Sequence, residues 1–280
     1  MPPMPPFPFC SVLFAFAPFA AALLIGIAAV VYINAYPETY SRMAGIAPLK
    51  FIAVPALTKH TATVIFVHGL GDTGLGWKPV ADMFKTDLPH VKWVLPHGPS
   101  MPVTANGGMV MPSWFDILSF GFDTEEDQPG MLETMHSLNQ LITAEVDAGI
   151  PANRIVLGGF SQGGAMSLLT GLTAERKFAG LAILSGWLPL HKSFKSMASE
   201  HAASIPIFWG HGKADPLVKF ALARMSVDHL KKDIGIPEAP STGELKGLSF
   251  NAYEGVGHST NQQEFDDLMV WLKKALPVAE

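Results

Sequence analysis

Short apolar runs rich in β-branched residues alternate along most of the chain with longer segments in which apolar residues recur every three or four positions. The short runs end in glycine or a polar residue and predict strands, whereas the longer segments predict amphipathic helices. The alternation predicts an α/β fold with a mainly parallel sheet and helices on both faces. The expected strands are 62–67, 92–96, 154–158, 180–185, 205–209 and 248–254, and the expected helices are 76–86, 130–147, 162–173, 217–232 and 262–275.

An uncharged apolar stretch precedes this alternation. No charged residue occurs from Phe7 to Ile33, and the first acidic or basic residue is Glu38. Because about 20 apolar residues cross a bilayer as a helix, we predict a transmembrane helix over about residues 9–33. Two alternatives stay open: a signal peptide cleaved near Ala35, and a mis-assigned translation start. The apolar region is longer than most signal peptides have, and no Lys or Arg precedes it.

Three parts of the chain follow from this pattern. Residues 1–33 form the N-terminal segment with the predicted transmembrane helix, 34–50 form a linker, and 51–280 form a single domain. Arg42 and Lys50 follow the apolar stretch, which favours a cytoplasmic domain under the positive-inside rule. We therefore expect a membrane-anchored protein whose domain faces the cytoplasm. A signal peptide would instead place it in the secretory pathway, and a mis-assigned start in the cytoplasm.

Composition excludes several classes of function. The chain has 19 basic and 24 acidic residues, a net charge of −5, so it lacks the basic surface that binding of nucleic acid requires. Its single cysteine excludes an intrachain disulfide and a cysteine-rich zinc site. No H-E-x-x-H motif or comparable ligand cluster occurs, so we expect no catalytic metal.

The motif Gly159-Phe160-Ser161-Gln162-Gly163 directly follows an expected strand and opens an expected helix. In such a turn the serine hydroxyl projects from the top of the sheet, while the glycines let the strand and helix backbones approach. This context favours a nucleophilic serine. The alternative is a glycine-rich turn whose serine only caps the helix.

A serine hydroxyl needs a histidine to take its proton. Of the ten histidines, His258 follows the last expected strand and lies in a glycine-rich loop, from which it could reach across the strand ends. His211 follows its strand so closely that it is expected to line the turn. His68 and His97 also follow strands, but both precede Ser161 in the chain. We therefore select His258 as the base.

The imidazole in turn needs a carboxylate that fixes its tautomer. Asp215 lies between the strand 205–209 and the next helix. Read alone, it is a helix cap with Pro216 in the first turn. Its place between Ser161 and His258 changes this interpretation, because serine, aspartate and histidine follow in this order in α/β-hydrolases.

An acyl-transfer site also needs backbone donors for the oxyanion. The residue after the serine, Gln162, supplies one amide, and Leu70 in the glycine-rich loop 68–74 is selected for the other. This loop lacks the G-K-[ST] ending of a phosphate-binding loop.

With these residues in view, the chain resembles the acyl-protein thioesterases of the phospholipase/carboxylesterase group of α/β-hydrolases over about residues 51–277. The matching segments are FVHGLGDTG, MPSWFDI, GIPANRIVLGGFSQGGAMSL, LSGWLPL, GKADPLV and YEGVGHS. The resemblance implies an α/β-hydrolase fold, a Ser161–Asp215–His258 triad, an oxyanion hole at Leu70 and Gln162, and no cofactor. It also implies fatty-acyl cysteine thioesters, lysophospholipids and simple esters as substrates. The stretch 7–33 is an addition to the family pattern, and 231–247 is longer than usual.

Apolar residues crowd the segment after MPS, which suggests a flap over a lipid groove. Ordinary core aromatics are the alternative for any one of them. A second wall is expected after the strand 180–185. The residues predicted to bind the acyl chain are Trp114, Ile117, Leu118, Phe120, Trp187 and Leu188.

The sequence thus predicts a serine hydrolase that cleaves palmitoylated or otherwise S-acylated proteins, and related acyl lipids, through an acyl-enzyme. It would meet these partners at a membrane through its N-terminal helix. One alternative is a carboxylesterase or lysophospholipase without protein substrates. Another is a catalytically silent relative that binds a ligand or serves as a membrane receptor, against which the intact triad argues.

Overall fold

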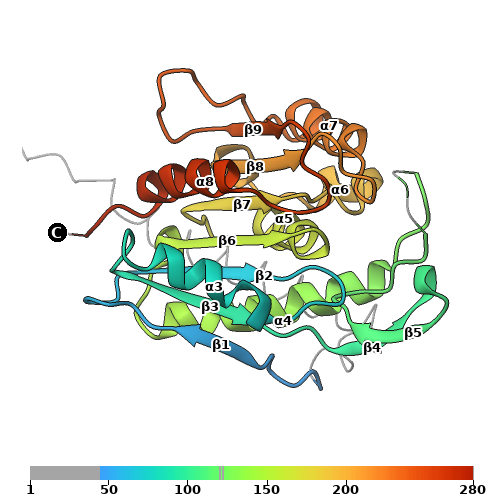
Figure 1. The fold of residues 1–280 in the computed structure, drawn as a ribbon, viewed down its shortest axis with the longest axis horizontal. Coiled ribbons are helices and arrows are strands. Elements are labelled where there is room, and N and C mark those ends of the chain that lie inside the picture. The colour runs from blue at the N-terminus through green and yellow to red at the C-terminus, as the bar shows by residue number, and fades with distance from the viewer. Residues whose placement is uncertain (1–44, 120, 122, 280) are drawn as a thin grey trace, which may run out of the picture. The chain divides into compact units, whose positions relative to one another are not determined.

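A seven-stranded sheet organises the part of the chain that the computed structural model describes, residues 45–119, 121 and 123–279 (Figure 1). β1 pairs antiparallel with β3, and the other neighbouring strands pair parallel. A separate antiparallel hairpin, β4–β5, lies on the side of the sheet where the parallel strands end (Figure 1). In spatial order the sheet contains β1 (Phe51–Val54), β3 (Val91–Pro96), β2 (Ala62–Val67), β6 (Ile155–Phe160), β7 (Gly180–Leu184), β8 (Ile207–Gly212) and β9 (Leu248–Tyr253), and the hairpin contains β4 (Ser100–Val103) and β5 (Met109–Pro112).

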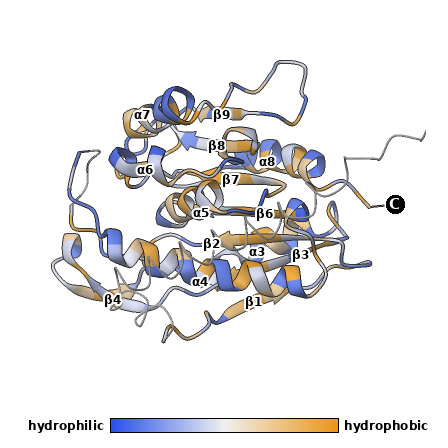
Figure 2. Ribbon diagram, turned by 180° about the vertical axis from the view of Figure 1, so that it is seen from behind, coloured by the Kyte–Doolittle hydropathy of each residue, from blue (hydrophilic) through white to orange (hydrophobic). Residues whose placement is uncertain are grey.

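Helices cover both faces of the sheet. α3 (Gly74–Phe84) and α8 (Gln262–Ala275) lie over the face seen in Figure 1, and α4 (Gln128–Asp147), α5 (Gln162–Thr173) and α7 (Phe220–His229) lie over the face seen in Figure 2. The short α6 (His191–Met197) follows β7. Three 3₁₀ turns and one π-helical turn complete the described elements: Thr104–Asn106, Ala152–Arg154, Ala202–Ser204 and Leu230–Ile234.

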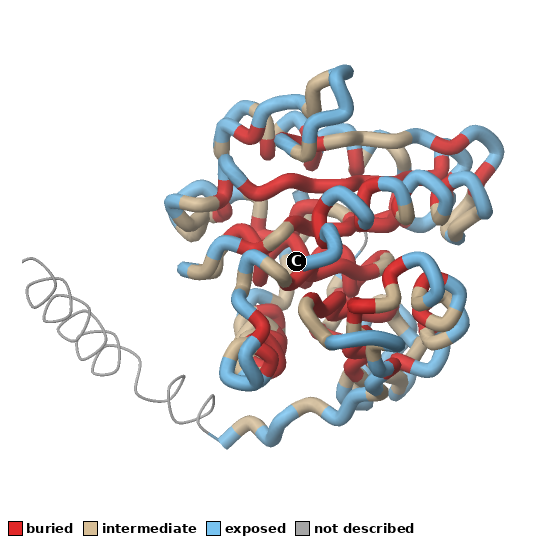
Figure 3. Tube along the Cα trace, turned by 90° about the vertical axis from the view of Figure 1, so that its left-hand side faces the viewer, coloured by how far each residue is buried: buried red, intermediate tan, exposed pale blue. Residues whose placement is uncertain are grey.

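Strand β2 shows why the sheet needs helices on both sides. All six of its residues are buried. Successive side chains point to opposite faces, so Phe66 packs in the cluster that contains Trp77 of α3, whereas Ile65 packs in the cluster that contains Leu138 of α4. Figure 3 shows the same distribution, with buried segments along the strands and exposed outer turns. Two hydrophobic cores therefore hold the strand ends in fixed relative positions.

The predicted α/β architecture is confirmed. Each expected strand and helix forms within a few residues of its predicted bounds, and α5 and α8 span the predicted residues. The pattern of the sequence did not indicate β1, β4, β5 or α6, which have four to seven residues each. The predicted N-terminal hydrophobic helix lies outside the described residues.

The prediction of a membrane-anchored protein is wrong. Among residues 45–119, 121 and 123–279, no helix is both long and apolar enough to cross a bilayer. The longest of these helices, α4, has 20 residues, but Glu133, Glu145 and Asp147 interrupt its apolar character. A helix that spans the hydrocarbon region needs about 20 predominantly apolar residues. The stretch 9–33, on which the prediction depended, lies outside the described residues.

Residues 47–280 form one compact unit. The predicted boundaries after residues 33 and 50 stay predictions.

Candidate active site

Ser161 occupies a strained turn between β6 and α5. Its φ of 55° and ψ of −120° are rare for a residue with a side chain and expose the serine at the top of the sheet. A Cβ atom on Gly159 would come within 2.5 Å of the Gly163 carbonyl, and one on Gly163 within 2.0 Å of the Val67 carbonyl oxygen. The two glycines of the motif therefore permit the turn. The Ser161 hydroxyl makes no capping bond to α5 in the described structure, which leaves it available for chemistry.

His258 connects this hydroxyl to a buried carboxylate. Its Nε2 lies 2.9 Å from Oγ of Ser161, and its Nδ1 lies 2.7 Å from Oδ2 of Asp215. Because an ionised carboxylate only accepts hydrogen bonds, Nδ1 carries the proton and donates it to Asp215. Nε2 is then free to accept the hydroxyl proton of Ser161. The structure thus brings together all three residues of the predicted triad, in the geometry of a nucleophile and its general base.

Backbone amides hold Asp215 in position. Its Oδ1 accepts hydrogen bonds from the N–H groups of Leu217 and Val218, both at 2.9 Å. Asp215 therefore also caps the turn that precedes α7. Its Oδ1 accepts the backbone amides, and its Oδ2 accepts the hydrogen bond from His258. Both interpretations of this residue from the sequence apply at once.

His211 supports the same turn from behind. Its Nε2–H donates to the carbonyl oxygen of Val218 at 2.7 Å and lies 3.6 Å from Oδ2 of Asp215. The side chain is fully buried, and burial lowers the pKa of His211, which keeps it neutral near pH 7. Because a neutral His211 forms no ion pair with Asp215, the Asp215 carboxylate can stabilise a positive charge on His258. The sequence predicted only that His211 lines the turn; its bond to Val218 depends on tertiary structure.

The two residues predicted for the oxyanion hole both lie near Ser161. Leu70 lines the same cavity as Ser161, and a Cβ atom on the preceding Gly69 would lie 3.4 Å from Cβ of Ser161. Gln162 is the first residue of α5, and the amides of the first helical turn have no acceptor within the helix. Amides at a helix N-terminus stabilise a developing negative charge. This arrangement suits acyl transfer.

A cavity of about 530 Å³ opens beside Ser161 and His258. Such a volume suits a ligand of moderate size. Its apolar walls come from α3, from the segment after β5, from the loop after β7 and from the start of α7. They include Trp77, Val80, Phe115, Ile117, Leu118, Trp187, Leu217 and Leu222.

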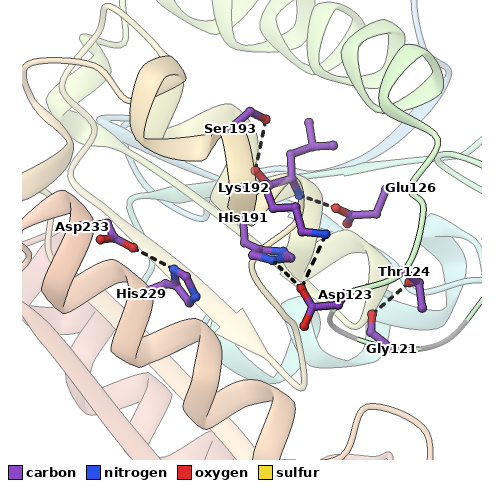
Figure 4. Close-up of polar contacts among 10 residues, drawn as sticks. Gly121, Asp123, Thr124, Glu126, His191, Lys192, Ser193, His229 and Asp233 are labelled. Atoms are coloured by element: carbon purple, nitrogen blue, oxygen red, sulfur yellow. Dashed lines mark hydrogen bonds and ion pairs between the residues drawn. The ribbon is translucent and has the colours of Figure 1, made fainter.

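Polar contacts fix one wall of this cavity to the start of α6 (Figure 4). Leu190 donates its backbone N–H to Oε2 of Glu126 at 2.8 Å, and Oδ1 of Asp123 lies 3.5 Å from Nε2 of His191. Glu126 itself lines the cavity, and burial raises its pKa. A half-buried carboxyl group thus links the segment that carries Ile117 to the loop after β7.

The residues predicted to bind an acyl chain divide into three groups. Ile117, Leu118 and Trp187 line the cavity. Trp114 and Leu188 are each 2% exposed and pack in the core instead. Phe120 lies outside the described residues. Phe115, from the same apolar segment, also lines the cavity, as do Trp77 and Leu217, which the sequence prediction did not select.

Comparison with known proteins agrees with this geometry. Residues 50–276 match the Phospholipase/Carboxylesterase family. The chain belongs to this family. The match covers the sheet, its helices and every residue of the candidate site, so the predicted membership and the α/β-hydrolase fold are confirmed.

Several relatives are similar over nearly their whole length. Acyl-protein thioesterase 1 of Cryptococcus neoformans var. neoformans is 52% identical over 81% of this chain and 98% of the relative. Acyl-protein thioesterase 1 of Neurospora crassa is 43% identical over 84% of this chain and 95% of the relative. The crystal structure of acyl-protein thioesterase 2 from Zea mays superposes with a TM-score of 0.69 at 30% identity, over 81% of this chain and 99% of that chain.

Proposed function

We propose that the protein is a serine hydrolase that removes fatty-acyl groups from the cysteine thioesters of S-acylated proteins and also cleaves related esters. The observation that carries this proposal is the hydrogen-bonded series Ser161–His258–Asp215 beside an apolar cavity of about 530 Å³. Membership of the Phospholipase/Carboxylesterase family supports it, as do relatives at 43% and 52% identity that are acyl-protein thioesterases.

The first half of the reaction forms an acyl-enzyme. Oγ of Ser161 attacks the acyl carbonyl carbon while Nε2 of His258 takes the hydroxyl proton. The amides of Leu70 and Gln162 stabilise the resulting oxyanion. As the tetrahedral intermediate collapses, the bond between carbon and sulfur breaks, and His258 returns its proton to the departing thiolate. The thiol leaves, and the acyl group stays on Ser161.

The second half repeats these steps with water. His258 takes a proton from a water molecule, which attacks the acyl-enzyme carbonyl and displaces Oγ of Ser161. The proton then returns to the serine, and the fatty acid leaves. Asp215 keeps the imidazole in one tautomer and stabilises its charged form throughout.

The cavity supplies selectivity for apolar chains. Ile117, Leu118 and Trp187 contribute to walls that exclude water from an alkyl group. Each methylene that leaves water contributes about 0.8 kcal/mol, so binding energy grows with chain length until the cavity is full. This favours fatty-acyl over acetyl groups.

Carboxylesterase or lysophospholipase activity would use the same residues, and the family description names phospholipases and carboxylesterases. The test compares three donors with the wild-type protein and Ser161→Ala: an S-palmitoylated cysteine peptide, palmitoyl lysophosphatidylcholine and p-nitrophenyl acetate. We expect the highest kcat/KM on the peptide thioester and loss of all three activities in the variant. A higher kcat/KM on the lysophospholipid would support the alternative. Absence of activity on all three donors in a folded wild-type protein would rule out the proposed hydrolase function.

A further inference from the structure

The segment 113–115 connects the two sides of the oxyanion hole. We propose that Trp114 is a positioning residue: its indole N–H fixes the loop that carries the Leu70 amide, while its backbone is fixed to Gln162. The inference rests on the proposed serine-hydrolase function. It assigns Trp114 a role other than contact with an acyl chain.

The first connection runs from Gln162 to the segment. The Gln162 side chain is fully buried, and its Oε1 accepts the backbone N–H of Trp114 at 2.9 Å. Its Nε2 donates to the carbonyl oxygen of Phe115 at 2.8 Å and to Oγ of Ser113 at 3.0 Å. A buried amide with all these bonds satisfied holds one orientation. The residue that follows the nucleophile is therefore bonded to all three residues of the segment.

The second connection runs from the segment to the loop after β2. Nε1 of Trp114 donates to the carbonyl oxygen of His68 at 2.8 Å, and the two rings pack with their centroids 4.8 Å apart. Nδ1–H of His68 donates to the carbonyl oxygen of Gly69 at 2.7 Å, and its Nε2 accepts the N–H of Gly98 at 2.9 Å. Burial lowers the pKa of His68, which favours the neutral ring that these two bonds require. Trp114 thus fixes the His68–Gly69 peptide, and the His68 ring in turn fixes the Gly69–Leu70 peptide that carries the Leu70 amide.

This arrangement addresses a specific problem of acyl transfer. The two oxyanion donors come from different segments, the loop after β2 and the start of α5, so their exact separation depends on the contacts that join these segments. Stabilisation of an oxyanion depends on donors fixed within a few tenths of an ångström of their working positions. A buried indole is a large apolar ring system with one polar group, its N–H. Phenylalanine would fill most of the same space but leave the loop without the hydrogen bond to the His68 carbonyl.

The test replaces Trp114 with phenylalanine and measures p-nitrophenyl acetate hydrolysis. Loosening one oxyanion donor should lower kcat roughly tenfold to hundredfold, since complete loss of a donor costs about 10²–10³. KM should stay within about twofold, and the pH profile of kcat/KM should not move, because the triad is untouched. Affinity for an alkyl boronic acid, which forms a tetrahedral adduct on Ser161, should fall in parallel with kcat.

A matched control is available in β3. Trp93 is 1% exposed, and its indole N–H has no hydrogen-bond partner among the described residues. Trp93→Phe removes a buried indole of equal size without removing such a bond, so kcat should stay close to the wild-type value. The smaller change Ser113→Ala removes one partner of the Gln162 side chain and should lower kcat several-fold with KM unchanged.

These results distinguish failure of the positioning role of Trp114 from failure of the proposed function. Wild-type kcat and boronate affinity in Trp114→Phe would overturn the positioning role, as would a loss expressed mainly in KM. If that variant does not fold, Ser113→Ala decides: unchanged kcat overturns the role, and a fall in kcat alone supports it. Failure on palmitoyl thioesters would reject the proposed substrate class, but p-nitrophenyl acetate and the boronic acid report on the serine site regardless.

Discussion

Oδ2 of Asp215 lies 2.7 Å from Nδ1 of His258, while Oδ1 of the same carboxylate accepts two backbone amides. One oxygen thus fixes the aspartate to the turn before α7, and the other fixes the tautomer of the histidine. His258 can then present an unprotonated Nε2 to Ser161.

Asp215→Asn should lower kcat by about 10³–10⁴ without unfolding the protein. An asparagine retains the shape of the side chain but can donate a hydrogen bond to Nδ1, which moves the imidazole proton to Nε2. Steady-state kinetics on p-nitrophenyl acetate measure this effect. Asp82→Asn is the control: Asp82 pairs with Lys78 on the surface of α3, and its change should alter kcat less than twofold. Similar rates in the two variants would show that Asp215 does not set the tautomer.

Leu118→Asp should remove the preference for long acyl chains. In the wild type, kcat/KM should rise about fourfold per methylene through medium lengths, the equivalent of about 0.8 kcal/mol, and then level off. A carboxylate in the cavity wall should flatten this rise but leave acetyl ester hydrolysis intact. The measurement is a series of p-nitrophenyl esters of graded length. Leu57→Asp, at a residue 57% exposed and outside the cavity, should leave the series unchanged. Equal losses on short and long esters in Leu118→Asp would indicate a structural role.

Stability should depend on pH through Glu264. This carboxyl group is fully buried in α8, and burial raises its pKa from 4.5 to about 8. Above pH 4.5 the unfolded chain releases a proton that the folded protein keeps. The free energy of unfolding should therefore fall as pH rises through this window, by up to about 1.4 kcal/mol per pH unit, and level off above pH 8.

Urea denaturation at several pH values measures this dependence. Glu264→Gln should remove most of the slope, whereas the same change at the exposed Glu254 should preserve it. Equal slopes in the wild type and in Glu264→Gln would show that Glu264 does not retain its proton.

Much of the fold followed from the sequence because its signals are local. Buried strands such as Ala62–Val67 are short runs rich in β-branched and aromatic residues, and the helices show apolar residues every three or four positions. By contrast, β4 and β5 have four residues each, and Pro102 and Pro112 lie within them. Such short strands depend on pairing with each other, which no local pattern records.

The same distinction applies to the site. Chain order was sufficient to select Ser161, Asp215 and His258, because each follows a strand that ends at the same edge of the sheet. It was not sufficient to tell Trp114 from Phe115. Both are apolar neighbours in a short segment and equally buried, yet of the two Phe115 alone lines the cavity. Which neighbour faces which side depends on hydrogen bonds to distant residues, such as the one between Trp114 and His68.

The central claim is that a fatty-acyl group passes through a covalent intermediate on Ser161. Mass spectrometry of the protein, quenched during turnover of an S-palmitoylated peptide, tests it most directly. We expect a palmitoyl adduct on the peptide fragment that contains Ser161, no adduct in Ser161→Ala, and loss of turnover by several orders of magnitude in that variant. An adduct on another residue, or full turnover in Ser161→Ala, would contradict the account.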